Sequence, residues 1–228
     1  MQSTQASTQT LGVLMLATRF PRIAGDIGHP ASLPFAARYR VVAGASAQRV
    51  VRERDPALLQ PFIDAGRSLV DEGAAAITTS CGFLVLFQQA LQAALSVPVW
   101  SSSLLLLPEL QRAAPAGIVT VDAAALGADH LRAAGAAPDT PVEGLAPGCA
   151  FQRTLLNDEP YLDVAEARAA TVAAAQRLVA RHPEIETIVL ECTNMPPYAD
   201  AVRAATGRTV HHLVSLLAQR LAPPGQAR

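Results

Sequence analysis

The sequence predicts an α/β fold of two similar lobes, each a mostly parallel sheet flanked by helices. Short apolar runs bounded by turn residues alternate with longer amphipathic segments, as expected for parallel strands covered by helices on both faces. The chain also repeats loosely, because Cys81 lies 18 residues before Val99 and Cys192 lies 18 residues before Val210. The halves are expected to face each other about a pseudo-twofold axis, with the active site in the cleft between them.

The N-terminal lobe is expected to span residues 11–115, after a disordered tail at 1–10. Its strands are the apolar runs 11–17, 75–79 and 97–100. Its helices are predicted at 56–72, 83–95 and 103–114, and the first begins with Asp55 as N-cap and Pro56 at the first helical position. Glutamines, Pro98 and serines interrupt the apolar region from 83 to 110, so we interpret it as helix, strand and helix in a core.

The C-terminal lobe is expected at 116–221, followed by a tail at 222–228. Its strands are predicted at 117–121, 141–145, 187–191 and 209–211, and its helices at 123–134, 161–181, 197–205 and 213–221. Asp122 precedes the first of these helices, and Pro196–Pro197 opens the third. The opening strand "AGIVTVDAA" matches "LGVLMLATR" at the start of the first lobe, which supports the duplication.

Composition excludes several classes of partner. Of the 228 residues, 50% are hydrophobic and 16% charged, which suffices for a sizeable core. The formal net charge of −1 leaves no electrostatic footprint for nucleic acid or an anionic membrane. The first apolar run, 11–17, is too short for a signal-peptide core or a membrane span. We therefore expect a cytoplasmic protein with no membrane segment.

The chain contains no lysine and only three cysteines, which limits its cofactors. A pyridoxal enzyme needs a lysine for its Schiff base, and the phosphate-binding GKS/GKT motif needs one too. The cysteines at 81, 149 and 192 form no CxxC pair, so neither a zinc site nor a dithiol site is indicated. No metal and no organic cofactor are predicted, and Cys149, which has no counterpart in the repeat, is interpreted as structural or incidental.

Cys81 and Cys192 occupy equivalent joints between an apolar strand and a helix. A single cysteine in that place is most often inert packing, but two at matched positions favour function. Small or polar residues flank both, namely Ser80, Gly82, Thr193 and Asn194. The adjoining helix N-termini are expected to favour thiolates. Two thiols on opposite faces of a ligand could invert a carbon next to a carboxylate: one removes the proton, the other returns one, and backbone amides stabilise the developing charge.

The loop from 18 to 34 is the other candidate binding element, because it follows the first strand and is rich in glycine, proline and charge. Arg19 could pair with a substrate carboxylate, and Asp26, between two turn glycines, could hold an ammonium. The alternative is a solvated loop in which such residues pair with each other. Glu191 is expected to point away from Cys192, because neighbouring strand residues face opposite ways.

The motifs "TTSCGF", "LECTNMPPY" and "GVLMLATRFPRIAGDIGHP" resemble the aspartate/glutamate racemase superfamily over about residues 11 to 221. The superfamily includes cofactor-independent racemases, hydantoin racemase, maleate isomerase and arylmalonate decarboxylase. The resemblance implies that Cys81 and Cys192 are the acid/base thiols and that Thr193 and Asn194 help to grip a carboxylate. It also implies a homodimer and no cofactor. Gly82 and Phe83 depart from the Asn-Thr that usually follows the first cysteine of glutamate racemases, and Phe83 could make that wall apolar.

The preferred interpretation is an isomerase that racemises aspartate, glutamate or a related small carboxylate by proton transfer between the two thiols. Arylmalonate decarboxylases keep only the second cysteine, so retention of both favours two-base chemistry. The same cleft could instead serve hydantoin racemisation, maleate-type isomerisation or malonate decarboxylation. A non-catalytic protein that binds small carboxylates is the alternative from another class.

Overall fold

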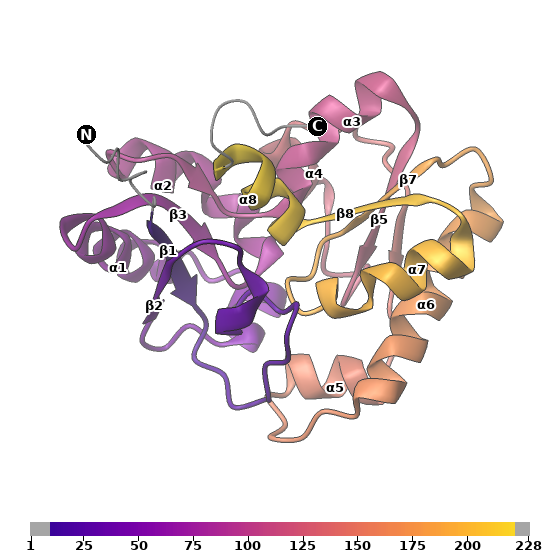
Figure 1. Ribbon diagram of the computed structural model, residues 1–228, viewed down its shortest axis with the longest axis horizontal. Coiled ribbons are helices and arrows are strands. Elements are labelled where there is room, and N and C mark those ends of the chain that lie inside the picture. The colour runs from indigo at the N-terminus through magenta and orange to yellow at the C-terminus, as the bar shows by residue number, and fades with distance from the viewer. Residues whose placement is uncertain (1–9, 222–228) are drawn as a thin grey trace, which may run out of the picture.

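The computed structural model describes residues 10–221, which form two α/β lobes side by side (Figure 1). The N-terminal sheet has the order β2-β1-β3-β4 and the C-terminal sheet the order β6-β5-β7-β8, with every pairing parallel. The strands are β1 (Thr10–Met15), β2 (Ala37–Val41), β3 (Ala74–Thr79), β4 (Val99–Trp100), β5 (Ala116–Thr120), β6 (Val142–Gly144), β7 (Thr187–Leu190) and β8 (Thr209–His212). The predicted two-lobe fold class is confirmed. Thr10 begins β1, whereas the rest of the predicted tails, 1–9 and 222–228, lies outside the described residues.

The duplication extends to individual hydrogen bonds. Ser80, just after β3, donates its backbone N–H to Leu14 O, and Glu191, just after β7, donates its own to Val119 O, each at 2.9 Å. Cys81 and Cys192 follow at once. The equivalence predicted for the two cysteines therefore holds at the level of the backbone.

Several predicted helices consist of a short 3-10 entry followed by an α-helix. The α-helices are α1 (Leu59–Asp71), α2 (Gln88–Ala94), α3 (Leu107–Ala113), α4 (Ala128–Ala134), α5 (Ala150–Leu156), α6 (Val164–Arg181), α7 (Ala199–Thr206) and α8 (Leu213–Leu221). The entries are η3 (Pro56–Leu58), η4 (Gly82–Phe87), η5 (Ser103–Leu106) and η6 (Pro196–Tyr198), with two further short turns at η1 (Pro30–Ser32) and η2 (Gln48–Arg52). Asp55 caps the first as predicted, since its side chain accepts the N–H of Ala57 at 2.9 Å.

Each half lends its last helical segment to the other half. Ser103 in η5 donates its hydroxyl to Leu190 O of β7 at 2.9 Å, and α3 continues against β5. In return, Leu213 and Leu217 of α8 join a buried cluster with Leu11 and Val13 of β1. This exchange, visible in Figure 1, fixes the two sheets relative to each other.

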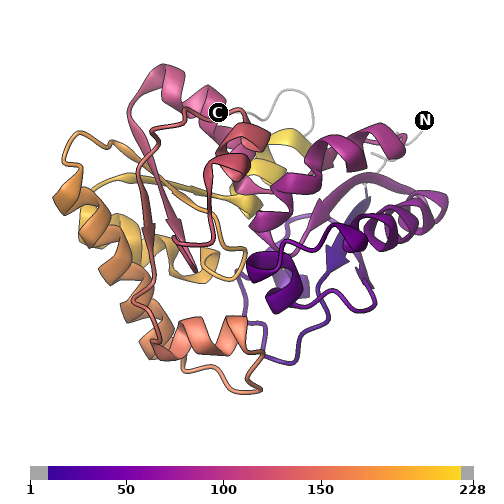
Figure 2. The ribbon, with the colours of Figure 1, turned by 180° about the vertical axis from the view of Figure 1, so that it is seen from behind.

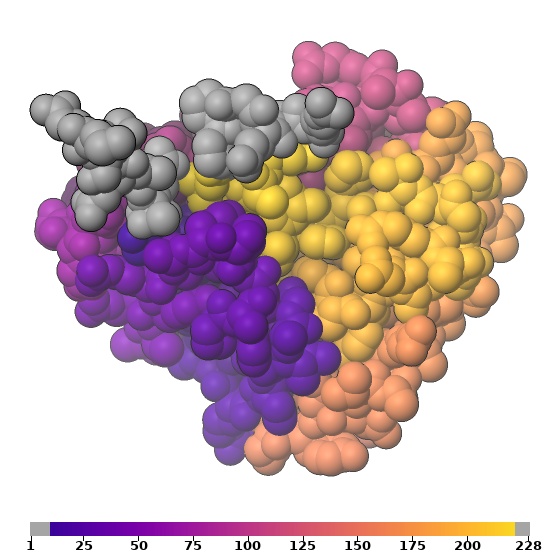
Figure 3. Space-filling view, viewed as in Figure 1, coloured from indigo at the N-terminus to yellow at the C-terminus, as the bar shows by residue number. Residues whose placement is uncertain are grey.

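The loop after β1 also crosses to the second lobe. Ile27 donates its N–H to Thr193 O at 3.4 Å, and Arg19 binds Asp158 beyond α5, where loop and helix meet at the lower edge of Figure 2. On the face shown in Figure 3, the indigo N-terminal loop and the yellow C-terminal segments pack directly against each other. Within residues 10–221, no helix has both the length and the apolar composition needed to cross a bilayer.

Candidate active site

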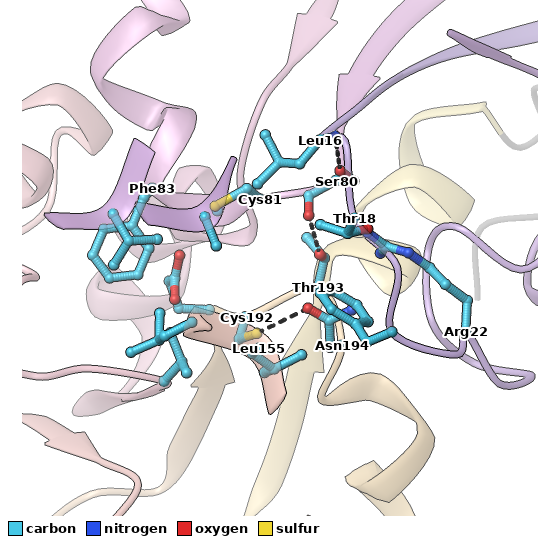
Figure 4. A pocket seen from close by; sticks show the side chains of 17 residues that line it. Leu16, Thr18, Arg22, Ser80, Cys81, Phe83, Leu155, Cys192, Thr193 and Asn194 are labelled. Carbon is cyan, nitrogen blue, oxygen red and sulfur yellow. Dashed lines mark hydrogen bonds between the residues drawn. The ribbon is translucent and has the colours of Figure 1, made fainter. Parts of the chain in front are cut away.

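Cys81 and Cys192 line one pocket between the lobes from opposite sides (Figure 4). The space between its walls, with the open solvent at its mouth included, is about 380 Å³. Much of its wall is apolar and comes from both lobes, with Leu16, Phe20, Val51, Val121, Leu155 and Leu156 among the lining residues. A few polar groups interrupt this wall, which is typical of a small-molecule site.

Seven of the nine predicted site residues line the pocket, namely Ser80, Cys81, Gly82, Phe83, Cys192, Thr193 and Asn194. Thr193 also joins the lobes, because its hydroxyl donates to Ser80 O at 2.7 Å. The Ser80 hydroxyl in turn accepts the N–H of Leu16 at 2.8 Å. These bonds fix the relative position of the two segments that carry the thiols.

Asp26 and Arg19 lie outside the pocket lining. Asp26 is buried behind it and accepts Arg22 Nη1 at 3.0 Å, Asn194 Nδ2 at 2.5 Å and the N–H of Gly28 at 2.7 Å. It therefore orients two lining side chains. Arg19 is largely exposed, and its Nε donates to Asp158 Oδ2 at 3.0 Å. Arg22, which the sequence does not distinguish from Arg19, is the arginine that lines the pocket.

Burial governs the protonation of both thiols. Burial, followed by the negative potential of Glu191, raises the pKa of Cys81 to about 12, against the opposing effect of the backbone N–H groups of Phe83 and Leu84. The same two causes raise the pKa of Cys192 well above its ordinary range. The expectation that helix N-termini favour thiolates is wrong for this arrangement, because desolvation outweighs the amide dipoles. The Cys192 thiol donates to Asn194 Oδ1 at 3.5 Å.

Glu191 is a pocket-lining residue that the sequence did not lead us to expect there. Its side chain lines the pocket although it was expected to point away, because β7 ends at Leu190 and strand alternation stops there. The residue is completely buried, and its Oε2 accepts the hydroxyl of Thr120 at 2.7 Å. Within residues 10–221, Oε1 has no hydrogen-bond partner. Burial raises the pKa of Glu191 to about 8, although the Thr120 bond opposes the shift.

A conventional metal site is absent from the described part of the chain. Across residues 10–221, no three His, Cys, Asp or Glu side chains come together in a way that could hold a metal ion. The pocket instead offers two thiols, one carboxyl, one guanidinium and several hydroxyl or amide groups. This set suits proton transfer to and from a small charged organic molecule.

Comparisons with known proteins give both sequence relatives and structural neighbours. The chain is 34% identical over 218 residues to a dimethylsulfoniopropionate lyase of Durusdinium sp. clade D, covering 90% of this chain and 71% of that protein. It is also 34% identical over 217 residues to dimethylsulfoniopropionate lyase 6 of Emiliania huxleyi, covering 88% of this chain but 56% of that protein. No protein-family model matches.

The structural neighbours share the fold at low sequence identity. Unliganded arylmalonate decarboxylase superposes with a TM-score of 0.63 at 18% identity, covering 97% of this chain and 95% of its own. A glutamate racemase of Bacillus anthracis gives a TM-score of 0.56 at 16% identity, covering 94% and 80%. The fold is that of the aspartate/glutamate racemase superfamily, as the resemblance implied.

Proposed function

Because the chain belongs to the family of dimethylsulfoniopropionate lyases, we propose that it is a lyase that cleaves a sulfonium-bearing propionate of this kind. The observation that carries the proposal is the 34% identity over 90% of the chain. The pocket supports it, because the thiol pair and the polar groups around Asn194 suit removal of a proton next to a carboxylate. The lyase assignment replaces amino-acid racemisation as our first choice.

The reaction can be written as a β-elimination. One pocket cysteine acts as the base after losing its own proton to solvent, against the high pKa that burial imposes on it. It takes the proton from the carbon next to the carboxylate, and the electron pair of that C–H bond forms the double bond. The C–S bond breaks, and its electrons leave with sulfur as neutral dimethyl sulfide, so that acrylate remains. The leaving group needs no proton, and the net change is release of one proton.

Two-base racemisation of a small amino acid is the second candidate. One observation favours it, since both thiols line the pocket from opposite sides, whereas an elimination needs a single base. The two candidates share the removal of a proton next to a carboxylate. They differ in whether a cationic group leaves from the neighbouring carbon.

The test is to incubate the purified protein with dimethylsulfoniopropionate and to measure dimethyl sulfide in the headspace and acrylate in solution. Parallel incubations with L- and D-aspartate and glutamate are analysed by chiral chromatography. Cys81→Ala and Cys192→Ala should each be compared with the wild type. Loss of the thiol that acts as base is expected to lower the rate by about 10²- to 10⁴-fold.

Cys149→Ala is the matched control, because Cys149 is a half-buried thiol that lies outside the pocket lining and accepts the N–H of Gln152. It should retain the wild-type rate within about twofold. Absence of dimethyl sulfide together with inversion of an amino acid would decide for the second candidate. Full lyase activity in a variant that lacks both pocket thiols would refute the proposed base.

A further inference from the structure

Glu191 is buried in the pocket wall, and the proton transfer assigned to the thiols gives it no role. An unpaired buried acceptor is costly, because it has lost water and gained no donor. Its Oε2 is satisfied by Thr120, whereas Oε1 has no partner within residues 10–221. The pocket wall therefore contains an acceptor that the described part of the protein leaves unused.

The duplication shows that this carboxyl is not required by the backbone. Ser80 occupies the equivalent place in the first lobe, with the equivalent strand-end hydrogen bond. The Ser80 hydroxyl accepts the N–H of Leu16 and is not left without a partner. Glu191 therefore introduces a difference between two otherwise matched positions.

Gly82 makes room for that difference. A Cβ at position 82 would lie 2.2 Å from Glu191 Oε1 and 2.4 Å from Glu191 O, closer than any real contact. Glu191 Oε1 therefore lies directly against the backbone of Gly82, the residue between Cys81 and Phe83. The glycine after the first cysteine and the glutamate before the second are two parts of one packing arrangement.

The two ends of the pocket differ, since one carries polar side chains and a guanidinium and the other is apolar. Thr18, Arg22, Thr193 and Asn194 gather at one end, Phe83 lies at the other, and the two thiols face each other between them (Figure 4). The contact with Gly82 puts the Glu191 carboxyl toward the Phe83 end. A molecule with a carboxylate at the Arg22 end and a cation at the Phe83 end would match both charges, with its central carbons between the thiols.

We propose that the Glu191 carboxylate and the Phe83 ring form the binding site for the cationic sulfonium group of the substrate, and that Gly82 is the specificity residue that admits this carboxylate. The choice of a sulfonium rests on the proposed function. An aromatic ring and a carboxylate both attract a cation that carries methyl groups, and the apolar wall accommodates those methyl groups.

Binding of such a cation would ionise Glu191. Burial raises its pKa to about 8, so the carboxyl is protonated below that pH until a positive charge arrives. The charged or titratable groups around it are the Cys81 and Cys192 thiols and the Arg22 guanidinium, and Thr120 donates to its other oxygen. A cationic ligand should therefore release one proton on binding, whereas a neutral one of the same shape should not.

The experiment compares two non-cleavable ligands by calorimetry at pH 6.5, in buffers of different ionisation enthalpy. N,N-dimethyl-β-alanine carries a protonated dimethylamino group in place of the sulfonium. 4-Methylpentanoate has the same branched shape without the charge. The wild type should favour the cation by at least about tenfold and release about one proton with it. Glu191→Gln should lose that preference, whereas Glu186→Gln, an exposed control just before β7, should keep it.

An unchanged preference in Glu191→Gln would overturn the proposal, as would failure of the wild type to bind either ligand. Proton release by the wild type tests it without any variant, so a misfolded Glu191→Gln leaves a decisive measurement, and cation binding without proton release would refute it. The calorimetry with non-cleavable ligands is independent of the cleavage assay. A protein that binds the cation through Glu191 but yields no dimethyl sulfide would refute the proposed function and leave the binding site standing.

Discussion

Replacing Gly82 with alanine should damage the protein far more than one methyl group usually does. The added Cβ would lie 2.2 Å from Glu191 Oε1 and 2.9 Å from its Cδ, and the carboxyl could swing away from these contacts. It would also lie 2.4 Å from the Glu191 backbone oxygen at the end of β7, which cannot swing. Overpacking of this kind costs about 1–3 kcal/mol, equivalent to a fall in Tm of roughly 3–10 °C for a chain of this size.

The assay is thermal unfolding followed by circular dichroism, with Gly66→Ala as the matched control. Gly66 is also buried and lies within helix α1. A Cβ there would meet only the side chain of Leu95, at 2.8 Å. Leu95 can adjust, and alanine favours a helix over glycine by about 1 kcal/mol, so the control should unfold near the wild-type temperature. A Gly82→Ala protein with an unchanged Tm would refute the packing described for the two cysteine segments.

Three further results are expected. Burial holds the pKa of Glu191 at about 8 in the folded protein, above the value of 4.5 that it regains on unfolding. The folded protein therefore loses stability as the pH rises between these two values. In urea titrations, the free energy of unfolding of Glu191→Gln should rise by about 2 kcal/mol relative to that of the wild type between pH 6 and pH 8. Asp26→Asn should lower the free energy of unfolding by about 3 kcal/mol and raise KM, because the pair with Arg22 is buried. Arg19→Ala should change each quantity by less than about 1 kcal/mol or twofold, since its pair with Asp158 is exposed.

The sheets and both thiol positions could be predicted because their signals are local. Continuous apolar runs identify buried parallel strands, and the repeated spacing identifies equivalent joints. β2 was missed because it is an edge strand that carries Arg38 and Arg40, and its Val41 is 60% exposed. Such a strand has no apolar run to detect, and its place is decided by pairing with β1.

Helix α5 was missed for a different reason. It has no counterpart in the repeat, and the motif "APGCAF" before it contains no familiar capping residue. Cys149 takes that part, because its Sγ accepts the N–H of Gln152 at 3.4 Å. The helix then supplies Leu155 and Leu156 to the pocket wall, a contribution that depends on tertiary packing and leaves no mark in local sequence.

The charged residues of the site were the least predictable. Arg19 and Arg22 lie in the same irregular loop, where no periodicity tells which one turns inward. For Glu191, the strand rule gave the wrong direction because the strand ends one residue earlier. Glu191 precedes one cysteine and Gly82 follows the other; they lie far apart in sequence, and only the fold brings them into contact.

Differences between corresponding positions of the two lobes change what a duplicated fold can do. Duplication alone would give two thiols in matched surroundings, which suits a reaction that treats both faces of a carbon alike. Here Gly82 and Phe83 follow one thiol where Thr193 and Asn194 follow the other, and Ser80 corresponds to Glu191. One end of the pocket is therefore apolar with a single acidic group, and the other is rich in donors. A substrate bound in this field has its two ends distinguished before any proton moves. That requirement is central to an elimination, in which the leaving group must depart from one particular carbon, and it is weaker for a racemase.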